Sequence, residues 1–376
     1  MNAHSRSAVF IRKKLPSWGW LIACIPALAL PVPGWGMRVR HLFRVEFPVP
    51  ALSASIQPGD IHHAARELLA RLTGDPDFTA QGIIGQLLDQ SNPWVAEYGY
   101  VEAPPQVIQK THGRDHYLLW VRFDPRVVEA AILGAHLPFW GALRPLTLAW
   151  LSVGSPADDI LSATASGHLR KNLDDRIRRL SLPVLLPLMD LRERLDVPVA
   201  KLMPPDWHTL ERASRRYGAE AIWTGVLLGS ARGGWQGEFS VRVGSLTSSW
   251  QTRGIHRRRW TVLKSALVHL DTLLAARYAV FAEHRPVPLV IRVTGVTTLS
   301  AVARIEHFLA TLPGLSAVRI LIVASRSLTL TLHSRISRSH LLRLIDLGGL
   351  LTLPETAPEP PTSGTRLNFI YRHSTG

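Results

Sequence analysis

The chain has 376 residues, of which 46% are hydrophobic and 19% are charged, which excludes wholesale disorder and is typical of a folded protein of two or three domains. A single Cys excludes a disulfide framework and any zinc or iron–sulfur site that needs several thiolates. The net charge is +15, but seven basic residues precede the first acidic residue, Glu46. About half of the excess charge therefore lies at the start of the chain, so the total does not by itself indicate nucleic-acid binding.

The first residues have the layout of a secretory signal. Residues 1–14 carry four basic residues and no acidic one, and residues 15–37 carry no charge. Four prolines interrupt the apolar run, and each would break or kink a membrane-spanning helix. We therefore expect residues 1–36 to be a signal peptide, cleaved after Gly34-Trp35-Gly36, that exports the protein to the periplasm or cell envelope of a bacterium.

Two other fates of this segment stay open. It could be retained as an inner-membrane anchor, which would give the protein a membrane contact. Leu21-Ile22-Ala23-Cys24 also fits the bacterial lipoprotein box, although the apolar run continues to Leu30, whereas a lipoprotein's apolar segment normally ends at its Cys. No later segment approaches the roughly 20 apolar residues that a bilayer span requires.

Residues 38–143 are expected to form an N-terminal α+β domain. The alternating residues Phe43, Val45 and Phe47 predict a half-buried strand. Asp60 is a candidate cap for a helix that ends before Gly74-Asp75-Pro76. The next elements expected are a short helix with Ile83, Ile84, Leu87 and Leu88 facing inward, a strand at 117–123 and a helix at 125–133.

Residues 144–284 are expected to form a middle α/β domain. Strands are predicted at 146–153, 184–186, 221–226, 238–243 and 246–253, and helices at 169–180, 210–217 and 261–281. This alternation indicates a mixed sheet with helices packed on it.

Residues 286–353 follow a β-α-β-β-α-β order, which predicts a ferredoxin-like unit. Its elements are a strand at 289–293, a helix at 299–311 that includes Leu299, strands at 315–322 and 328–332, a helix at 338–346 and a closing strand. Residues 354–376 begin as a Pro-rich linker, and 366–371 could form a last strand. The sequence does not decide whether 349–352 or 366–371 closes the sheet. The fold class expected is thus a multi-domain α+β protein with small mixed sheets that carry helices on one face.

An ordered series of short stretches resembles a bacterial family of exported proteins, the domain of unknown function 2066. The stretches are residues 71–75, 137–141 with Arg144-Pro145, 183–187 with Asp190, 214–219 with Gly225, and 276–278, together with Trp150, Trp235 and Trp250. The chain departs from the family pattern after Gly225, where a basic residue is usual. The resemblance implies an envelope protein but supplies no catalytic residue or ligand. More loosely, the middle domain resembles the amino-terminal domain of TolB and modules of flagellar assembly protein T, which are interaction domains of the bacterial envelope.

Known catalytic and metal motifs are missing from the sequence. His62 and His63 are adjacent, so on a helix they point about 100° apart. There is no His-Glu-x-x-His, phosphate loop or nucleophile elbow. Arg114-Asp115-His116 fits a turn before a strand, and the glycine-rich residues 229–234 fit a hairpin loop. No catalytic, cofactor-binding or metal-binding residue is therefore predicted, and no cofactor.

Three acidic groups are candidates for the paired carboxylates that hydrolysis can use. Asp158-Asp159 falls in a polar loop, Asp174-Asp175 lies beside basic residues that suggest solvated ion pairs, and Glu193 with Asp196 is the third. Asp190 alone follows an apolar strand, where it is either a helix cap or a catalytic acid.

Two basic clusters are candidates for binding anions. One comprises Arg176, Arg178 and Arg179. The other comprises Arg253, Arg257, Arg258 and Arg259, between Trp250 and Trp260, which are aromatic residues of the kind that stack on single-stranded nucleic acid.

The leading hypothesis is a non-enzymatic envelope scaffold or binding protein. Its expected partner is another envelope protein or an anionic lipid or polysaccharide, and export argues against nucleic acid. The alternatives are a periplasmic enzyme that uses Asp190 and a histidine, and a basic nucleic-acid-binding protein.

Overall fold

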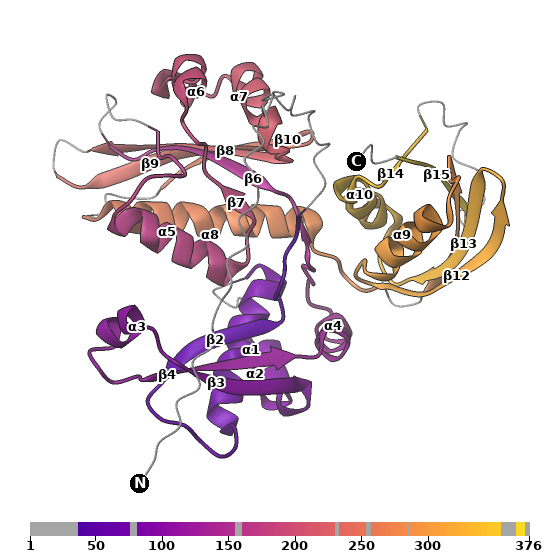
Figure 1. The fold of residues 1–376 in the computed structure, drawn as a ribbon, viewed down its shortest axis with the longest axis horizontal. Helices are drawn as coiled ribbons and strands as arrows, with labels where there is room; N and C mark the ends of the chain where they lie inside the picture. The colour runs from indigo at the N-terminus through magenta and orange to yellow at the C-terminus, as the bar shows by residue number, and fades with distance from the viewer. Residues whose placement is uncertain are drawn as a thin grey trace, which may run out of the picture.

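The structure is a computed structural model. It describes residues 37–75, 81–154, 160–229, 233–252, 257–283, 286–354 and 366–372. The expected signal peptide, Cys24, Asp158-Asp159 and Arg253 lie outside these ranges. The described chain forms three sheet-containing domains (Figure 1), and the predicted multi-domain α+β class is confirmed.

The N-terminal domain is a three-stranded antiparallel sheet with helices packed against it. The strand order is β2-β4-β3. Helix α1 packs its apolar stripe, which includes the fully buried Leu68 and Leu72, in the core. The strands are β2 (Arg44–Val49), β3 (Val95–Glu102) and β4 (Tyr117–Phe123), and the helices are α1 (Pro58–Thr73), α2 (Gln81–Asp89), the 3-10 turn Asn92–Trp94, α3 (Pro105–Lys110) and α4 (Pro125–Gly134).

Two expectations for this domain are wrong in detail. Asp60 lies in the first turn of α1 and does not cap it, because the helix begins earlier, at Pro58, with Gln57 as its N-cap residue. Ile83 is exposed, because the buried face of α2 consists of Ile84, Leu87 and Leu88.

The middle domain is a five-stranded mixed sheet of order β10-β9-β8-β6-β7. Strands β7, β6 and β8 are parallel, and β8, β9 and β10 are antiparallel. The strands are β6 (Thr147–Ser152), β7 (Val184–Leu185), β8 (Ala221–Gly229), β9 (Trp235–Val243) and β10 (Leu246–Gln251), and the helices are α5 (His168–Leu180), α6 (Leu191–Asp196), the 3-10 turn Val199–Lys201, α7 (Trp207–Ser214), the 3-10 turn Arg215–Tyr217 and α8 (Arg259–Tyr278).

Helices cover both faces of this sheet, rather than the one face expected. Figure 1 shows α5 and α8 on one side and α6 and α7 on the other. Trp150 and Ile222 pack in a separate cluster with Leu210 of α7, whereas Trp223 belongs to the main core. The inner strand β6 is accordingly buried along its whole length, which explains why the middle of its sequence is apolar.

The C-terminal domain is a five-stranded sheet of order β12-β13-β11-β15-β14. Both candidate closing strands are in the sheet, and β15 lies between β11 and β14, parallel to β11. The last segment thus takes the place next to β11 and leaves the short β14 at the edge. Leu299 is exposed rather than buried. The elements are β11 (Val287–Thr294), α9 (Leu299–Ala310), β12 (Leu315–Ala324), β13 (Ser327–Ser334), α10 (Arg338–Gly348), β14 (Leu351–Thr352) and β15 (Arg366–Tyr371).

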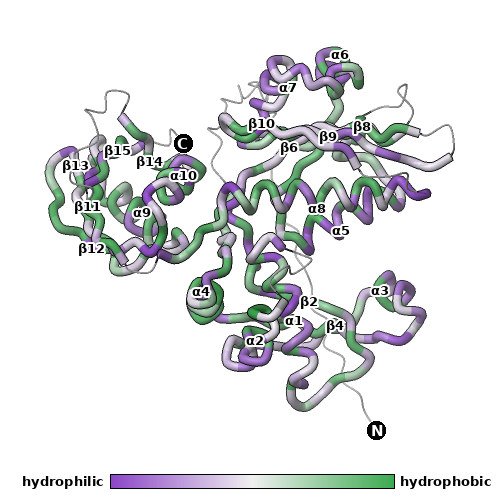
Figure 2. Tube along the Cα trace, turned by 180° about the vertical axis from the view of Figure 1, so that it is seen from behind, coloured by the Kyte–Doolittle hydropathy of each residue, from purple (hydrophilic) through white to green (hydrophobic). Residues whose placement is uncertain are grey.

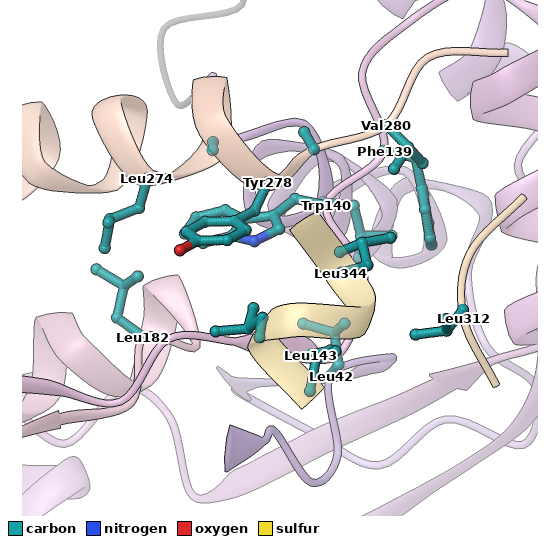
Figure 3. Packing of buried hydrophobic residues seen from close by; sticks show 14 of the residues in the cluster. Leu42, Phe139, Trp140, Leu143, Leu182, Leu274, Tyr278, Val280, Leu312 and Leu344 are labelled. Atoms are coloured by element: carbon teal, nitrogen blue, oxygen red, sulfur yellow. The ribbon is translucent and has the colours of Figure 1, made fainter. Parts of the chain in front are cut away.

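The three domains meet in one apolar junction. Figure 3 shows Leu42 and Trp140 beside Leu182 and Tyr278 of the middle domain and Leu344 of the C-terminal domain. Close to it, β1 (Met37–Arg38) pairs with β5 (Leu143–Arg144). The junction therefore fixes the relative positions of the domains by burial of side chains from all three.

Two buried arginines connect backbone segments at this junction. Arg144 is fully buried, lies 4.0 Å above the Trp140 ring and donates to the carbonyl oxygens of Arg71 at 2.9 Å and Leu180 at 2.8 Å. Arg71 donates to the carbonyl oxygens of Leu42 at 3.0 Å and Arg179 at 3.0 Å. These charged groups are satisfied by carbonyl oxygens of several segments, which specifies how α1 meets the end of α5.

Within the described residues, no helix is both long enough and apolar enough to cross a membrane.

Candidate functional site

A cavity of about 900 Å³ lies where the N-terminal domain meets helix α5 of the middle domain. We call it the interdomain cavity. Its walls come from residues 37–48, from Glu67 and Arg71 of α1, from α3 with Leu118 of β4, and from residues 175–183 at the end of α5. The two arginines at the junction explain its position, because Arg71 joins the backbone after β1 to the last turn of α5.

Positive charge predominates around this cavity. The lining contains three acidic residues, Glu46, Glu67 and Asp175. It contains seven basic residues, which are Arg38, Arg40, Arg44, Arg71, Lys110, Arg178 and Arg179. A concave wall with an excess of one charge raises the local concentration of ions of the opposite sign. The cavity is therefore electrostatically suited to an anionic ligand.

Some of these cations are neutralised by neighbours. Lys110 donates to Asp175 at 2.8 Å, and Arg178 also contacts Asp175. Burial alone would raise the pKa of Asp175, but the hydrogen bond from Lys110 and the nearby positive charges lower it below the usual value. Arg44 contacts Glu46 at 3.3 Å. Asp175 thus stays ionised and joins α3 to α5 across the cavity wall.

Arg38, Arg40 and Arg179 have no such neighbour, although Arg38 donates a hydrogen bond to the Thr311 hydroxyl. Across the described part of the chain, no carboxylate lies within ion-pair distance of Arg40 or Arg179, and both side chains are exposed. Their guanidinium groups each offer five N–H donors in a geometry that matches carboxylate or phosphate oxygens. Arg40 and Arg179 are therefore the best candidates to contact an anionic ligand directly.

The cavity also has an apolar part. Eight of its lining residues are apolar: Met37, Val39, Pro48, Val107, Leu118, Ile177, Leu182 and Pro183. Its volume lies within the range of about 300–1,000 Å³ that is usual for small-molecule sites. The combination fits a ligand with an anionic group and an apolar portion.

A second cavity of about 540 Å³ shares Lys110, Asp175 and Arg178 with the first and adds Arg170 and Lys171. A third of about 580 Å³ shares Arg71 and Arg179. Helix α5 thus lines all three hollows, and the first predicted basic cluster contributes to them, with Arg178 and Arg179 in the interdomain cavity and Arg176 in the third.

Asp190 takes the helix-cap role that was one of its two predicted roles. Its side chain accepts a hydrogen bond from the backbone N–H of Glu193 at 2.9 Å, at the start of α6, and one from Arg216 at 2.6 Å. The hydrogen bond from Arg216 lowers the pKa of Asp190 below its usual value. A carboxylate that is ionised, exposed and already paired lacks the raised pKa expected of a general acid near neutral pH.

Glu193 is the buried acid of this region. It accepts hydrogen bonds from the Tyr217 hydroxyl at 2.6 Å and from the backbone N–H of Met189 at 2.7 Å. Burial, with the hydrogen bond to Glu193, raises the pKa of Tyr217 to about 12. These bonds hold the start of α6 against the segment after α7. Asp196, its predicted companion, instead contacts Arg192 at 3.6 Å.

The remaining acidic pair, Asp174-Asp175, forms ion pairs, as expected. Asp174 accepts from Arg170 at 2.9 Å on α5, and Asp175 contacts Lys110 and Arg178. Among the described residues there is no group of three or more His, Cys, Asp or Glu that could hold a metal ion.

In the second predicted basic cluster, Arg259 and the flanking Trp250 are already engaged by neighbouring groups. Arg259 lies 4.1 Å above the Trp235 ring and donates to the Val153 carbonyl oxygen at 2.8 Å. Trp250 lies between Phe239 and His269, with ring centroids 5.8 and 4.7 Å away. Its faces are therefore already occupied.

Sequence reasoning missed the basic residues of the N-terminal segment as part of a site. In the sequence, Arg38, Arg40 and Arg44 belong only to the charge excess before Glu46, and Lys110 belongs to no predicted site. No local sequence pattern marks these residues as a group, because other basic residues, such as Arg66 and Arg122, lie between them in the chain. Only the fold brings them together.

The structure also shows what two of the stretches behind the family resemblance do. Arg71 and Arg144 are buried at the junction, and Gly74 packs so closely on Ala275 that an added Cβ would lie 2.1 Å from the Cβ of Ala275. These residues fix packing rather than supply chemistry. The resemblance to the domain of unknown function 2066 stays a prediction.

Comparison with known proteins gives little further information. A family model described as a domain of unknown function, DUF8605, matches residues 37–141, which is less than half of the chain and coincides with the N-terminal domain and its link to β5. No curated protein matches this chain.

Proposed function

We propose that this protein is a non-enzymatic binding protein of the bacterial envelope whose interdomain cavity takes a single-chain anionic amphiphile, such as a lysophospholipid that carries a phosphate group. The observation that carries the proposal is the excess of cations around a cavity of about 900 Å³ that also has apolar lining. The anionic head would contact Arg40 and Arg179, and the apolar portion would lie against residues such as Val39 and Leu182.

Delivery to the envelope depends on the leader. The basic residues 1–14 and the uncharged run 15–37 support export, with cleavage after residue 36. Amino-terminal sequencing of the protein from fractionated cells tests this part: a mature chain that starts at Met37 in the periplasmic fraction supports it, and an intact leader in the cytosol contradicts it.

Calorimetric titration of the purified protein with lysophosphatidic acid, below its micelle concentration, tests the ligand class. We expect binding to lysophosphatidic acid and at least tenfold weaker binding to both an uncharged monoacylglycerol and inorganic phosphate, because the first lacks the charge and the second the apolar chain. Equal binding of the charged and uncharged lipids would contradict the proposal.

Variants of the unpaired arginines locate the site. Arg40→Ala and Arg179→Ala should each weaken binding at least about tenfold, because each removes a charge-assisted hydrogen-bond donor. Arg126→Ala is the matched control, since Arg126 is an exposed arginine in α4, outside the cavity lining, with no ion pair among the described residues. An equal loss in the control would indicate non-specific charge attraction.

A further inference from the structure

The outer strand of the C-terminal domain exposes a continuous apolar run. Within β12, Leu321, Ile322 and Val323 are 55, 60 and 57% exposed, and Ile320 is exposed as well. In a strand, successive side chains point to opposite faces, so both faces of β12 are uncovered at this end. Figure 1 shows β12 at the outer edge of the molecule, away from the other two domains, and Figure 2 shows the same position from behind.

One further exposed apolar residue, Leu299, lies at the same end of the sheet. Thr294 pairs with Ser327, and Ala324 pairs with Ser327, so the end of β11 and the turn between β12 and β13 are neighbours. Leu299, which begins α9 shortly after Thr294, is 83% exposed. This edge of the domain, defined by Leu299 and residues 320–323, is called the apolar edge.

The charge around the apolar edge is positive. Residues 315–335 contain three arginines and no acidic residue. Arg319 and Arg326 flank the apolar run, both are exposed, and neither has a carboxylate within ion-pair distance among the described residues. The described residues of the whole C-terminal domain, 286–354 and 366–372, hold nine arginines against two acids, Glu306 and Asp346.

We infer that the apolar edge docks on an anionic lipid bilayer, with residues 320–323 and Leu299 entering the interfacial region while Arg319 and Arg326 contact the headgroups. Apolar insertion combined with cations at its margin is how peripheral segments bind anionic membranes. The inference does not depend on the ligand of the interdomain cavity.

Pairing of β12 with a strand from a second copy fits the geometry less well. The register of β12 against β13 shifts between Ser316 and Arg319 and again between Ile320 and Ile322. Such bulges twist an edge strand and interrupt its row of free N–H and C=O groups, which disfavours a regular strand addition. A lipid surface needs no backbone register, so the bulges do not oppose it.

A local probe on the full chain tests the inference even if residues 15–37 also bind lipid. In a Cys24→Ser background, Ile322→Cys carries an environment-sensitive fluorophore. The matched control places the same fluorophore at Leu195→Cys, on α6, because Leu195 is also highly exposed. Vesicles of phosphatidylglycerol with phosphatidylcholine are compared with vesicles of phosphatidylcholine alone.

We expect the emission of the probe at position 322 to shift to the blue with phosphatidylglycerol vesicles, and that of the probe at 195 to stay unchanged. Arg319→Gln with Arg326→Gln should lower the partition coefficient reported at position 322 about 30-fold, since each arginine near an anionic surface contributes about fivefold. Circular dichroism of the variants checks that the fold is retained.

Three results would overturn the inference. The first is unchanged emission of the probe at position 322 when the protein is bound to vesicles, and the second is unchanged emission with both kinds of vesicle. The third is an emission shift that depends on protein concentration in the absence of vesicles, which would indicate that the edge binds a second copy of the chain.

Discussion

Replacing Asp271 by Asn removes a carboxylate that is buried in α8 and accepts no hydrogen bond from the described residues. Burial raises the pKa of Asp271 from 3.8 to about 7, against the attraction of Arg144 and Arg176. One pH unit corresponds to about 1.4 kcal/mol, so keeping this group ionised in the folded state costs up to about 4 kcal/mol above pH 7. Because the folded pKa is raised, this cost is absent below pH 3.8, where the group is protonated in both states, grows as the pH rises, and is complete above pH 7.

A competing effect has to be compared with this cost. Removing one partner of a buried ion pair typically costs about 3–5 kcal/mol, because the other charge stays buried without a partner. Arg144, however, donates its hydrogen bonds to carbonyl oxygens, including those of Gly141 and Leu180, and none to Asp271. Burial also lowers the pKa of Arg144 only to about 9, so it stays protonated near neutral pH. We therefore expect desolvation of Asp271 to be the larger effect.

The predicted outcome is that Asp271→Asn stabilises the protein at pH 8, by up to about 4 kcal/mol, and has little effect at pH 4. Urea unfolding at pH 4, 6 and 8, followed by tryptophan fluorescence and circular dichroism, measures the difference. Asp346→Asn, which changes an exposed carboxylate in α10, should leave the midpoint unchanged at each pH. A less stable Asp271→Asn protein at pH 8 would refute the reasoning and show that Arg144 needs this counter-charge.

Three further changes test the packing of the junction and of the C-terminal sheet. Gly74→Ala should lower the free energy of unfolding by more than about 3 kcal/mol, because the new Cβ meets Ala275 at 2.1 Å and the backbone has φ 66°. The control Gly113→Ala has φ 74° and nothing within 4 Å of its new Cβ, so it should lower the free energy of unfolding only by the backbone strain of about 1–2 kcal/mol. Similar melting temperatures for the two variants would contradict the contact. Arg144→Met should lower the free energy of unfolding measured in urea by more than about 3 kcal/mol, since several buried carbonyl oxygens lose their hydrogen-bond donor. An unchanged free energy of unfolding would show that Arg144 does not hold these segments together. Phe369→Ala should cost about 3–5 kcal/mol in the calorimetric transition of the C-terminal domain, and a loss below about 1 kcal/mol would mean that β15 is not an integral strand.

Elements with a clear apolar period were predictable from the sequence. The helix expected at 261–281 is α8 (Arg259–Tyr278), and the hairpin expected near Gly244 is formed by β9 and β10. Strand β3 was missed because its residues are half-buried or exposed on both faces, so no alternation marks it. Helix α3, six residues long and without a buried residue, is too short to show a period.

The position of β15 could not be predicted because its pairing is not local. It follows a Pro-rich stretch and pairs in parallel with β11, so no turn sequence links the two strands. The interdomain cavity escaped prediction for a similar reason. Arg40 and Arg179 are far apart in the sequence, and tertiary contacts, including those of Arg71 with the carbonyl oxygens of Arg44 and Arg179, bring their segments together.

Hydrogen–deuterium exchange of the full chain with and without lysophosphatidic acid tests the central proposal most directly. The proposal predicts slower exchange on ligand addition in residues 37–48, in α3 and in residues 177–183, which together line the interdomain cavity, with no change in α6 and α7. Unchanged exchange in those three segments, while the ligand is bound, would contradict the assignment of the cavity as the binding site.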